Sequence, residues 1–439
     1  MSISLYNSLS RNMEVFVPAN PDAVKMYACG PTVYDFAHIG NARPAITFDI
    51  LYRLLRYTYG SDHVVYVRNL TDVDDKIIAR SQRDKLSIKN LTEMTAQAYQ
   101  EDTKGLGCLQ PTMQPCATEY IAEMIDMICR LVTKEHAYVA DGHVLFDVTS
   151  YPEYGQLSGR NLDQMMAGIR IEVADYKRHN LDFVLWKPSA ENEPGWESPF
   201  GRGRPGWHIE CSAMIEACLH GSIDIHAGGL DLLFPHHENE IAQSCCARGD
   251  ATLASTWLHN GFVTVDGQKM SKSAGNFLTI RTLREAHAGR ALRLQMLMTH
   301  YRQPLDWQQS RTEECSLIIK KWFRAIEGHD TAIDCELVSA LEDDLNTPAA
   351  ITILHRRARL QEWSYLRFGL ELLGFMDADV DALQTNDRPS KELVEDMIKQ
   401  RNTARKNKDF AAADSLRDQL TKMGVTIKDG PDGTNWEYN

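Results

Sequence analysis

The alternation of apolar and polar positions predicts a strand, a helix and a second strand near the start of the chain. Residues 24–29 (VKMYAC) have the pattern of a buried strand, and apolar residues at helical spacing lead to Gly60. A second strand is predicted over 63–72. A strand–helix–strand unit implies a parallel sheet, whose ligands gather at the carboxyl ends of its strands. Cys29 and Thr71 fall at two such ends, so we expect them to lie near each other.

The pattern after this unit predicts an insertion in the sheet. Helices are expected from about 76 to 135, and 138–148 is predicted to be a hairpin with Asp141-Gly142 at its turn. The stretch up to about 200 holds Pro, Gly and Trp without a regular period and is expected to be irregular. Strands are then predicted again at three places: 207–211, 222–229 and 261–265. Cys211 ends the first of these.

The C-terminal part of the chain is predicted to be helical. Ser310 and Glu313 fit a capping box for a helix that ends at Gly328, and apolar helices continue to about 380. TNDRPS at 385–390 is typical of a linker, and two basic helices with a small tail follow. The chain is therefore predicted to be an α/β protein: a Rossmann-type parallel-sheet domain with an insertion, then an α-helical bundle and a small C-terminal domain.

Length and composition fit a multidomain protein outside the membrane. A chain of 439 residues with 43% hydrophobic residues suggests roughly three domains. It has no apolar run of about 18 residues and no charged-then-apolar leader, so neither membrane insertion nor secretion is indicated and a cytoplasmic location is expected. The ten cysteines lack paired spacing, which favours free thiols and metal ligands over disulfides.

The charge distribution argues against indiscriminate nucleic-acid binding. The net charge is −13, whereas phosphate affinity requires clustered Lys and Arg. The segment from Lys399 to Asp429, however, contains eight Lys and Arg residues and only four aspartates. This segment is either a nucleic-acid contact or a solvated helix surface, and charge alone does not decide.

The motif PHHENE at 235–240 stands where an amphipathic helix is predicted to begin. Pro235 suits the first helical position, and His236 and Glu240 then lie one turn apart on one face. The pattern fits both a hydrated helix start and a pair of metal ligands. A zinc protease would require His-Glu-x-x-His, which this order does not give.

Two further motifs occur in order on either side of the insertion. HIGN, residues 38–41, lies between the first strand and its helix and is a weak signal by itself. KMSKS, residues 269–273, is far more specific, because lysines and serines on an exposed loop supply charge and hydrogen-bond donors to a polyphosphate.

With these motifs the sequence resembles the class I aminoacyl-tRNA synthetases and, over essentially its whole length, the bacterial cysteinyl-tRNA synthetase family. The stretches that carry the resemblance are YACGPTVYDFAHIGNAR, YVRNLTDVDDKII, RPGWHIECSAM, DIHAGGLDLLFPHHENEIAQS, KMSKSAGNF, DDLNTPAA, DFAAADSLRDQL and DGPDGTNW. One position departs from the family motif: Asn41 stands where the first motif usually ends in His, and an amide carries neither a proton nor a charge.

The resemblance implies a zinc ion that binds the thiolate of L-cysteine. Its ligands would be the matches to the family's zinc site: Cys29, Cys211, His236 and Glu240. Thiolate, imidazole and carboxylate are all accepted zinc ligands. By the same resemblance, the cysteine pocket would include Thr32, Thr71 and Trp207, although Trp207 also fits a simple core position.

The resemblance also assigns the residues that act on Mg-ATP. The catalytic group would be His38, Asn41, Lys269 and Lys272. ATP would contact His38, Gly40, Asn41, Gly228, Gly229, Asp231 and Lys272. Glycines permit close approach of the backbone, and a carboxylate accepts hydrogen bonds from ribose hydroxyls.

The implied enzyme is a cysteine–tRNA ligase that makes cysteinyl-adenylate and charges tRNA(Cys), expected to be a monomer. The expected domains are a catalytic domain (1–135 and 201–260), a connective insertion that contacts the acceptor end (136–200), a KMSKS and stem-contact region (261–309), a helical tRNA-binding bundle (310–384) and a basic anticodon-binding domain (385–439). Two alternatives stay open: a zinc-dependent cysteine ligase that acylates a small amine, and a noncatalytic tRNA-binding paralogue.

Overall fold

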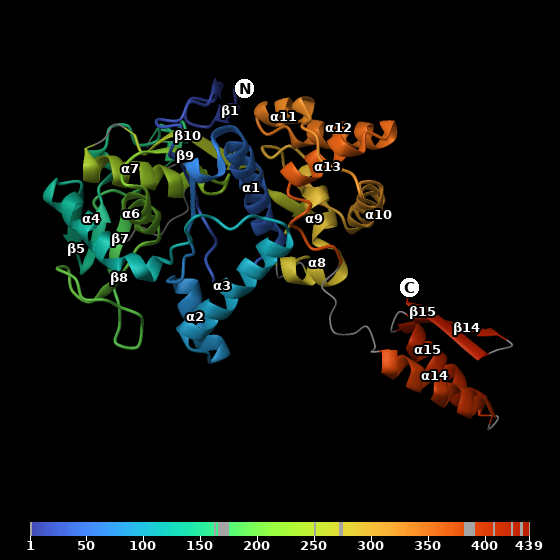
Figure 1. Ribbon diagram of the computed structural model, residues 1–439. Coiled ribbons are helices and arrows are strands. Elements are labelled where there is room, and N and C mark those ends of the chain that lie inside the picture. Colours follow the sequence, from blue (N-terminus) through green and yellow to red (C-terminus); the bar gives the residue numbers. More distant parts are fainter. Residues whose placement is uncertain are drawn as a thin grey trace. The chain divides into compact units, whose positions relative to one another are not determined.

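The computed structural model describes residues 2–161, 164–165, 175–249, 252–271, 275–381, 391–406, 409–422, 425–430 and 433–438. The chain divides into two compact units, Met1–Val380 and Asp381–Asn439 (Figure 1). Among the described residues, no helix has the length and apolar character needed to cross a membrane.

A parallel sheet of four strands forms the centre of the first unit. Its order is β10 (Ala254–Asn260), β9 (Ile223–Gly229), β3 (Val24–Ala28) and β4 (Val64–Arg68). Helix α1 (Ile39–Tyr59) connects β3 to β4 and ends before Gly60, as predicted. The parallel sheet predicted from the first strand–helix–strand unit is therefore confirmed, whereas the sequence analysis did not predict β10.

Helices cover both faces of this sheet. The buried side of α1 packs with Met26 and Ala28 of β3 in one core, and Tyr27 and Val67 belong to a second core on the other face. The second core is formed with α6 (Trp207–Leu219), α7 (Glu238–Arg248) and α4 (Ile121–Thr133). Figure 1 shows α1 on one side of β9 and β10, and α6 and α7 on the other.

The strand predicted at 207–211 is wrong, because these residues open helix α6. All residues from Ile209 to Ile215 are buried. A helix that is buried on every side has no polar face, so the usual period is lost and the run WHI imitates a strand. Cys211 consequently reaches the sheet edge from a helix rather than from a strand end.

The helix predicted to begin at Pro235 begins later. Leu233–His237 form a short separate helical turn, Phe234 has extended backbone angles (φ −141°, ψ 130°), and α7 starts at Glu238. His236 and Glu240 nevertheless stay one turn apart, with His236 Nε2 3.0 Å from Glu240 Oε1.

The insertion contains a small antiparallel sheet. Strands β5 (Ala137–Ala140) and β6 (His143–Phe146) form the predicted hairpin, with positive φ at Asp141 and Gly142. Two strands continue this sheet, β7 (Phe183–Pro188) and β8 (Gly203–Pro205). The expectation of an irregular stretch up to 200 is thus wrong for β7.

The remaining elements of the first unit surround this framework. They are β1 (Ser4–Asn7), β2 (Asn12–Val15), α2 (Asp75–Asp84), α3 (Ile88–Gly105), β11 (Val263–Val265), β12 (Gln268–Lys269), α8 (Ile280–Ala286), α9 (Gly289–Leu297), β13 (Leu305–Trp307), α10 (Gln309–Ala325), α11 (Cys335–Glu342), α12 (Thr347–Leu360) and α13 (Trp363–Leu372). The helical C-terminal part is confirmed. The capping box is wrong: Ser310 already lies inside α10, Gln308 is its N-cap, and the helix ends at Ala325 before reaching Gly328.

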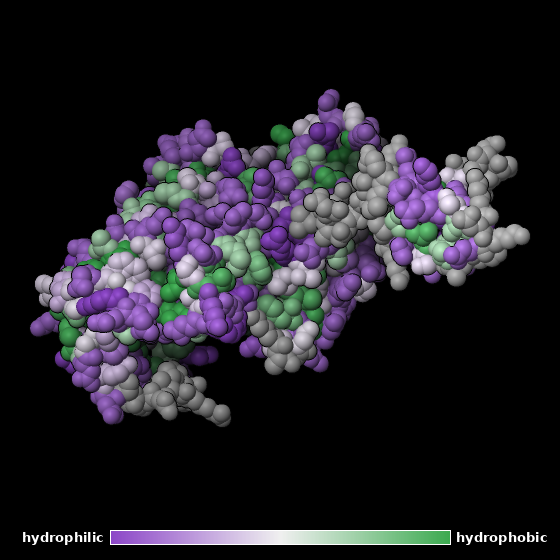
Figure 2. All heavy atoms as spheres, turned by 90° about the horizontal axis from the view of Figure 1, so that it is seen from below, coloured by the Kyte–Doolittle hydropathy of each residue, from purple (hydrophilic) through white to green (hydrophobic). Residues whose placement is uncertain are grey.

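The second unit has two helices and a hairpin: α14 (Lys391–Lys406), α15 (Phe410–Lys422), β14 (Val425–Gly430) and β15 (Gly433–Tyr438). Val394, Met397, Ile398 and Leu420 form its core, and Trp436 packs against them. The face drawn in Figure 2 is largely hydrophilic, with hydrophobic residues in several separate places. Each unit therefore buries apolar side chains in cores of its own, which stabilises its fold.

Candidate active site

The site lies where β3 ends and Cys29 follows. The backbone N–H of Cys29 donates to the carbonyl of Ala227 on β9, which fixes the cysteine at the edge of the sheet. Cys29, Thr32 and Trp207 line a cavity of about 680 Å³. Trp207 is 39% exposed, so it forms a wall of this cavity and is not a core residue.

Four predicted ligands converge at this edge from different elements. One ligand atom from each of Cys29, Cys211, His236 and Glu240 lies within 4.8 Å of the others. The sulfur atoms of Cys29 and Cys211 are 3.7 Å apart, and Cys29 Sγ is 3.4 Å from Glu240 Oε1. Two sulfurs, one imidazole and one carboxylate form a donor set that suits a zinc ion.

The electrostatics of these groups also favour a cation. Burial raises the pKa of Cys29, and the nearby Cys211 and Glu240 raise it further. A hydrogen bond from Cys29 lowers the pKa of Cys211 to about 6 against the effect of burial. Burial lowers the pKa of His236, but Glu240 and Cys211 outweigh it and raise the value to about 10. Two thiols and one carboxyl group, which are negative when deprotonated, are thus buried close together. A divalent cation at this place would stabilise their deprotonated forms.

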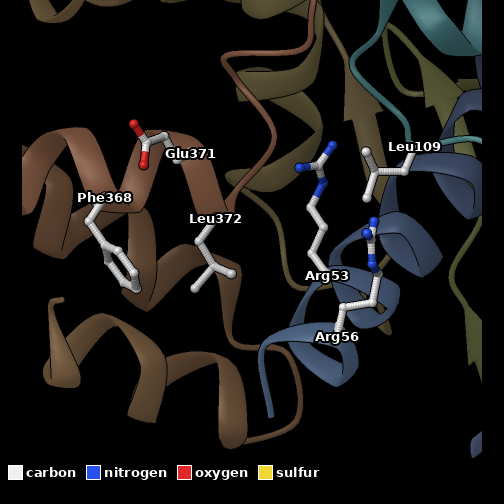
Figure 3. Close-up of a pocket in the computed structure, with 6 residues that line it drawn as sticks. All are labelled: Arg53, Arg56, Leu109, Phe368, Glu371 and Leu372. Atoms are coloured by element: carbon white, nitrogen blue, oxygen red, sulfur yellow. The ribbon is translucent and has the colours of Figure 1, made fainter. Parts of the chain in front are cut away.

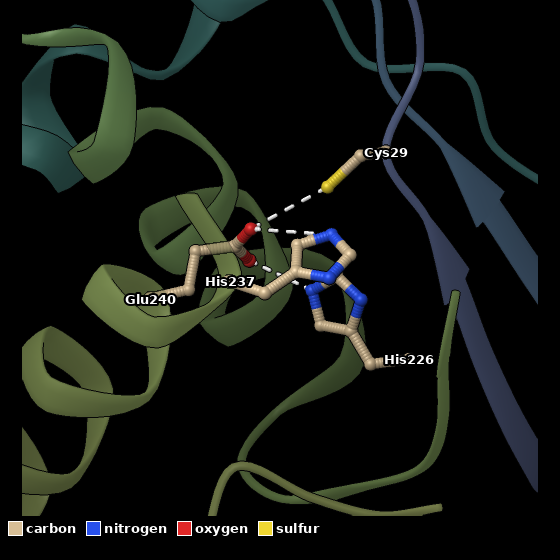
Figure 4. Close-up of side chains that lie close together, drawn as sticks. All are labelled: Cys29, His226, His237 and Glu240. Atoms are coloured by element: carbon tan, nitrogen blue, oxygen red, sulfur yellow. Dashed lines mark hydrogen bonds and ion pairs between the residues drawn. The ribbon is translucent and has the colours of Figure 1, made fainter. Parts of the chain in front are cut away.

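A second donor set shares two of these residues. Cys29, His226, His237 and Glu240 also place one ligand atom each within 4.8 Å (Figure 4). His226 Nε2 lies 2.7 Å from Glu240 Oε2, whereas His237 Nε2 is 4.0 Å from Glu240 Oε1. This set offers one sulfur instead of two, and His237 Nε2 lies farther from Glu240 Oε1 than His236 Nε2 does, at 4.0 Å against 3.0 Å. We therefore regard His226 as a partner that orients the Glu240 carboxylate.

The histidines around the site form close contacts with one another, and His226 and His259 among them were not predicted from the sequence. His237 Nδ1 is 2.8 Å from His259 Nε2, and His259 Nδ1 is 2.8 Å from Ser8 Oγ. His208 Nδ1 is 2.9 Å from His236 Nδ1. Burial lowers the pKa of His208 and of His259 to about 3. The available signal was a histidine next to apolar residues: His226 stands between Ile225 and Ala227, and His259 follows Leu258.

The two threonines predicted to contact the substrate are adjacent but face different surroundings. Thr32 and Thr71 pair as an isolated parallel bridge, which confirms that the two strand ends meet. Thr32 lines the cavity, whereas Thr71 is buried and its hydroxyl donates to Glu210 Oε2 at 2.9 Å. Only Thr32 is thus placed on the cavity wall.

The HIGN motif forms the start of α1 and faces the same cavity. The backbone N–H of Gly40 donates to His38 Nδ1 at 3.1 Å, and the backbone N–H of His38 donates to Asn41 Oδ1 at 3.0 Å. Asn41 therefore closes the first turn of the helix. His38, Gly40 and Asn41 all line the cavity at a helix N-terminus, where the helix dipole favours an anion.

Two more of the predicted ATP residues line the same cavity: Gly229, the last residue of β9, and Asp231, two residues further on. A Cβ on Gly228 would lie 2.7 Å from the ring of His237. Lys269 also lines the cavity, and Lys272 lies outside the described residues. Asn276, not singled out before, supports this loop by accepting from the backbone N–H of Ser271 at 2.9 Å.

Comparisons with known proteins show the family to which the chain is related. Residues 15–316 match the family described as the tRNA synthetases class I (C) catalytic domain, and 390–436 match the cysteinyl-tRNA ligase anticodon binding domain. A cysteine–tRNA ligase of Methylocella silvestris is 52% identical over 100% of this chain and 99% of that protein. The cysteine–tRNA ligase of Beijerinckia indica is 51% identical over the same shares.

Solved structures support the fold. The methionyl-tRNA synthetase of Mycobacterium tuberculosis with methionyl-adenylate superposes with a TM-score of 0.52 at 12% identity, covering 87% of this chain and 84% of that one. A LeuRS of Agrobacterium radiobacter K84 in a ternary complex gives 0.56 at 10% identity, covering 82% and 84%. At this identity the likeness establishes the Rossmann-like class I synthetase fold alone.

Proposed function

The chain belongs to the cysteine–tRNA ligase family of class I aminoacyl-tRNA synthetases, and on that basis we propose that it activates L-cysteine with Mg-ATP and transfers it to the 3′-terminal ribose of tRNA(Cys). Cysteine carboxylate attacks the α-phosphate and pyrophosphate leaves, which forms cysteinyl-adenylate. The ribose hydroxyl then attacks the acyl carbon, and AMP leaves. Positioning and charge stabilisation dominate such chemistry, so no protein base is required.

The observation that carries this proposal is the convergence of Cys29, Cys211, His236 and Glu240 beside the cavity that His38 and Lys269 also line. These four residues would hold one zinc ion. When bound, zinc supplies a site for a thiolate, which an alcohol of much higher pKa occupies poorly. A snug pocket alone rejects a near-isosteric analogue by roughly 10² at best, so the metal accounts for selection against serine.

The residues of the two motifs would act on ATP. His38, fixed through Nδ1 by Gly40, presents its ring at the positive end of α1, close to where the α-phosphate would lie. Lys269 and Lys272 would supply positive charge to the phosphates, and Asp231 would accept from the ribose.

The second unit would bind the tRNA. Its match to an anticodon-binding family supports a tRNA acceptor over a small amine, and the ligand set together with HIGN supports catalysis over binding alone. A single chain carries all these groups, so we propose a monomer that works in the cytoplasm, where tRNA is charged.

The decisive experiment is ATP–pyrophosphate exchange with each of the twenty amino acids, with and without a zinc chelator. Cysteine alone should support exchange, and chelation should abolish it until zinc is restored. Exchange supported equally by serine, or exchange by zinc-free protein, would overturn the proposal.

A further inference from the structure

The reaction cavity extends beyond the cysteine site into an inner compartment. This part of the cavity is lined by Pro44 and Phe48 of α1, Tyr66 and Arg68 of β4, and Tyr99 of α3. Phe48, Tyr66 and Tyr99 belong to the core on the α1 face of the sheet, whereas Cys211 belongs to the core on the opposite face. The compartment is therefore continuous with the active site but lies on the other side of the strand ends.

Arg68 lines this compartment without an anionic partner. Arg68 is 3% exposed, and its Nε has no hydrogen-bond partner among the described residues. Its guanidinium carbon lies 5.3 Å from the centre of the Tyr99 ring. Arginine keeps its charge in proteins. Burying a charge without a partner is costly, so a guanidinium in this position requires a compensating group.

The neighbours of Arg68 do not supply that group. The Tyr66 hydroxyl is buried and lacks a partner among the described residues. Asp49, whose charge acts on Arg68, already accepts from Arg53, Arg293 and the backbone N–H of Leu109. The compartment therefore presents hydrogen-bond donors and one positive charge.

A second cavity of about 280 Å³ serves as a contrast. Arg53 and Arg56 line it together with Phe368 and Leu372 (Figure 3). There Arg53 is paired with Asp49 and with Asp377, each at 2.8 Å, so its charge is already compensated. Of these two cavities, the one lined by Arg68 holds a buried arginine for which no ion pair is found among the described residues, whereas the charge of Arg53 is paired.

We propose that the inner compartment binds a small oxyanion, a carboxylate or a phosphate, through the Arg68 guanidinium with hydrogen bonds from Tyr66 and Tyr99. Planar guanidinium groups bind both oxyanions through paired hydrogen bonds. The oxyanion is either a separate anion or the carboxylate of the amino-acid substrate, and the second source rests on the proposed function.

The first test measures binding of inorganic phosphate to the full chain by calorimetry, without ATP, cysteine or tRNA. Arg68→Met should weaken the phosphate affinity about ten-fold or more, while Arg68→Lys retains part of it. Arg83→Met is the matched control, because Arg83 is an exposed arginine paired with Asp84 and should leave the affinity unchanged. Equal phosphate binding by wild type and Arg68→Met would overturn the free-anion source.

The second test distinguishes the source of the carboxylate. L-Cysteine and cysteamine share the thiol, but cysteamine lacks the carboxylate. If the substrate carboxylate occupies the compartment, phosphate competes with L-cysteine but not with cysteamine. Arg68→Met then weakens the binding of L-cysteine and leaves the binding of cysteamine unchanged. If a separate anion occupies it, phosphate and L-cysteine bind together. If neither phosphate nor L-cysteine binding depends on Arg68, the proposal is wrong.

Folding and function are controlled separately. If the Arg68→Met variant does not fold, the binding of phosphate and of L-cysteine is measured on the Tyr66→Phe and Arg68→Lys variants instead. Phosphate binding that depends on Arg68, together with no cysteine-dependent pyrophosphate exchange, would support the anion site and contradict the proposed function. Exchange activity without phosphate binding or L-cysteine binding that depends on Arg68 would contradict the anion site and support the proposed function.

Discussion

Replacement of Cys211 by serine distinguishes the two donor sets at the sheet edge. Both sets contain Cys29 and Glu240, but Cys211 occurs only with His236, and His237 occurs only in the alternative set. Serine is close to cysteine in size and a poor zinc ligand, so the substitution removes one donor with little change in packing.

The expected loss of zinc affinity follows from the contacts. Residues that merely orient a ligand contribute about 10–100-fold to metal affinity, so loss of a ligand should cost about 100-fold or more, about 2.8 kcal/mol. Chelator competition measures this loss. His237→Asn is the matched control, because His237 contacts His259 and should cost about ten-fold at most.

Cobalt substitution supplies an independent count of sulfur ligands. Thiolate-to-cobalt absorption should fall to about half in Cys211→Ser, and should rise again when L-cysteine adds its own thiolate. Wild-type zinc affinity in Cys211→Ser together with a large loss in His237→Asn would refute the assignment and favour the set drawn in Figure 4.

Three other outcomes are expected. Asp49→Asn should lower the free energy of unfolding by about 3–5 kcal/mol in urea titration, because it leaves buried Arg293 uncompensated; a loss below about 1 kcal/mol would contradict this. Burial raises the pKa of Asp102 to about 6 although Arg284 opposes it. The folded chain thus keeps a proton that the unfolded chain releases near its ordinary pKa of 3.8, so stability is lost as pH rises from about 4 to 6, and Asp102→Asn should flatten that slope. Deletion of 381–439 should spare pyrophosphate exchange and sharply reduce aminoacylation; equal loss of both would contradict the role of the second unit.

The sequence predicted the strand that positions Cys29 because β3 is short, apolar and followed by a recognisable loop. It failed at α6, where the burial of every residue from Ile209 to Ile215 removes the polar face by which a helix is recognised. The position of Cys211 beside Cys29 was predicted from the wrong element. Its sulfur still reaches the site because both a strand end and an early turn of a helix can point toward the same sheet edge.

The residues around the ligands were harder to predict than the ligands themselves. His226 and His259 come from two strands whose adjacency in the sheet was not predicted, because β10 was missed. Thr71 was placed correctly by its strand, but its hydroxyl is turned toward Glu210, a contact that no local pattern encodes. Side-chain direction depends on tertiary neighbours, which spacing along the chain does not reveal.

Asn41 closes the first turn of α1 by accepting from the backbone of His38, and this has a consequence for measuring nucleotide affinity. A substitution at this position that removes the acceptor, such as Ala, loosens the main chain that carries the imidazole. Its effect on KM for ATP would then combine two causes: the loosened first turn of α1 and any lost contact with a phosphate. Asp, which restores the acceptor while adding charge, separates the two contributions.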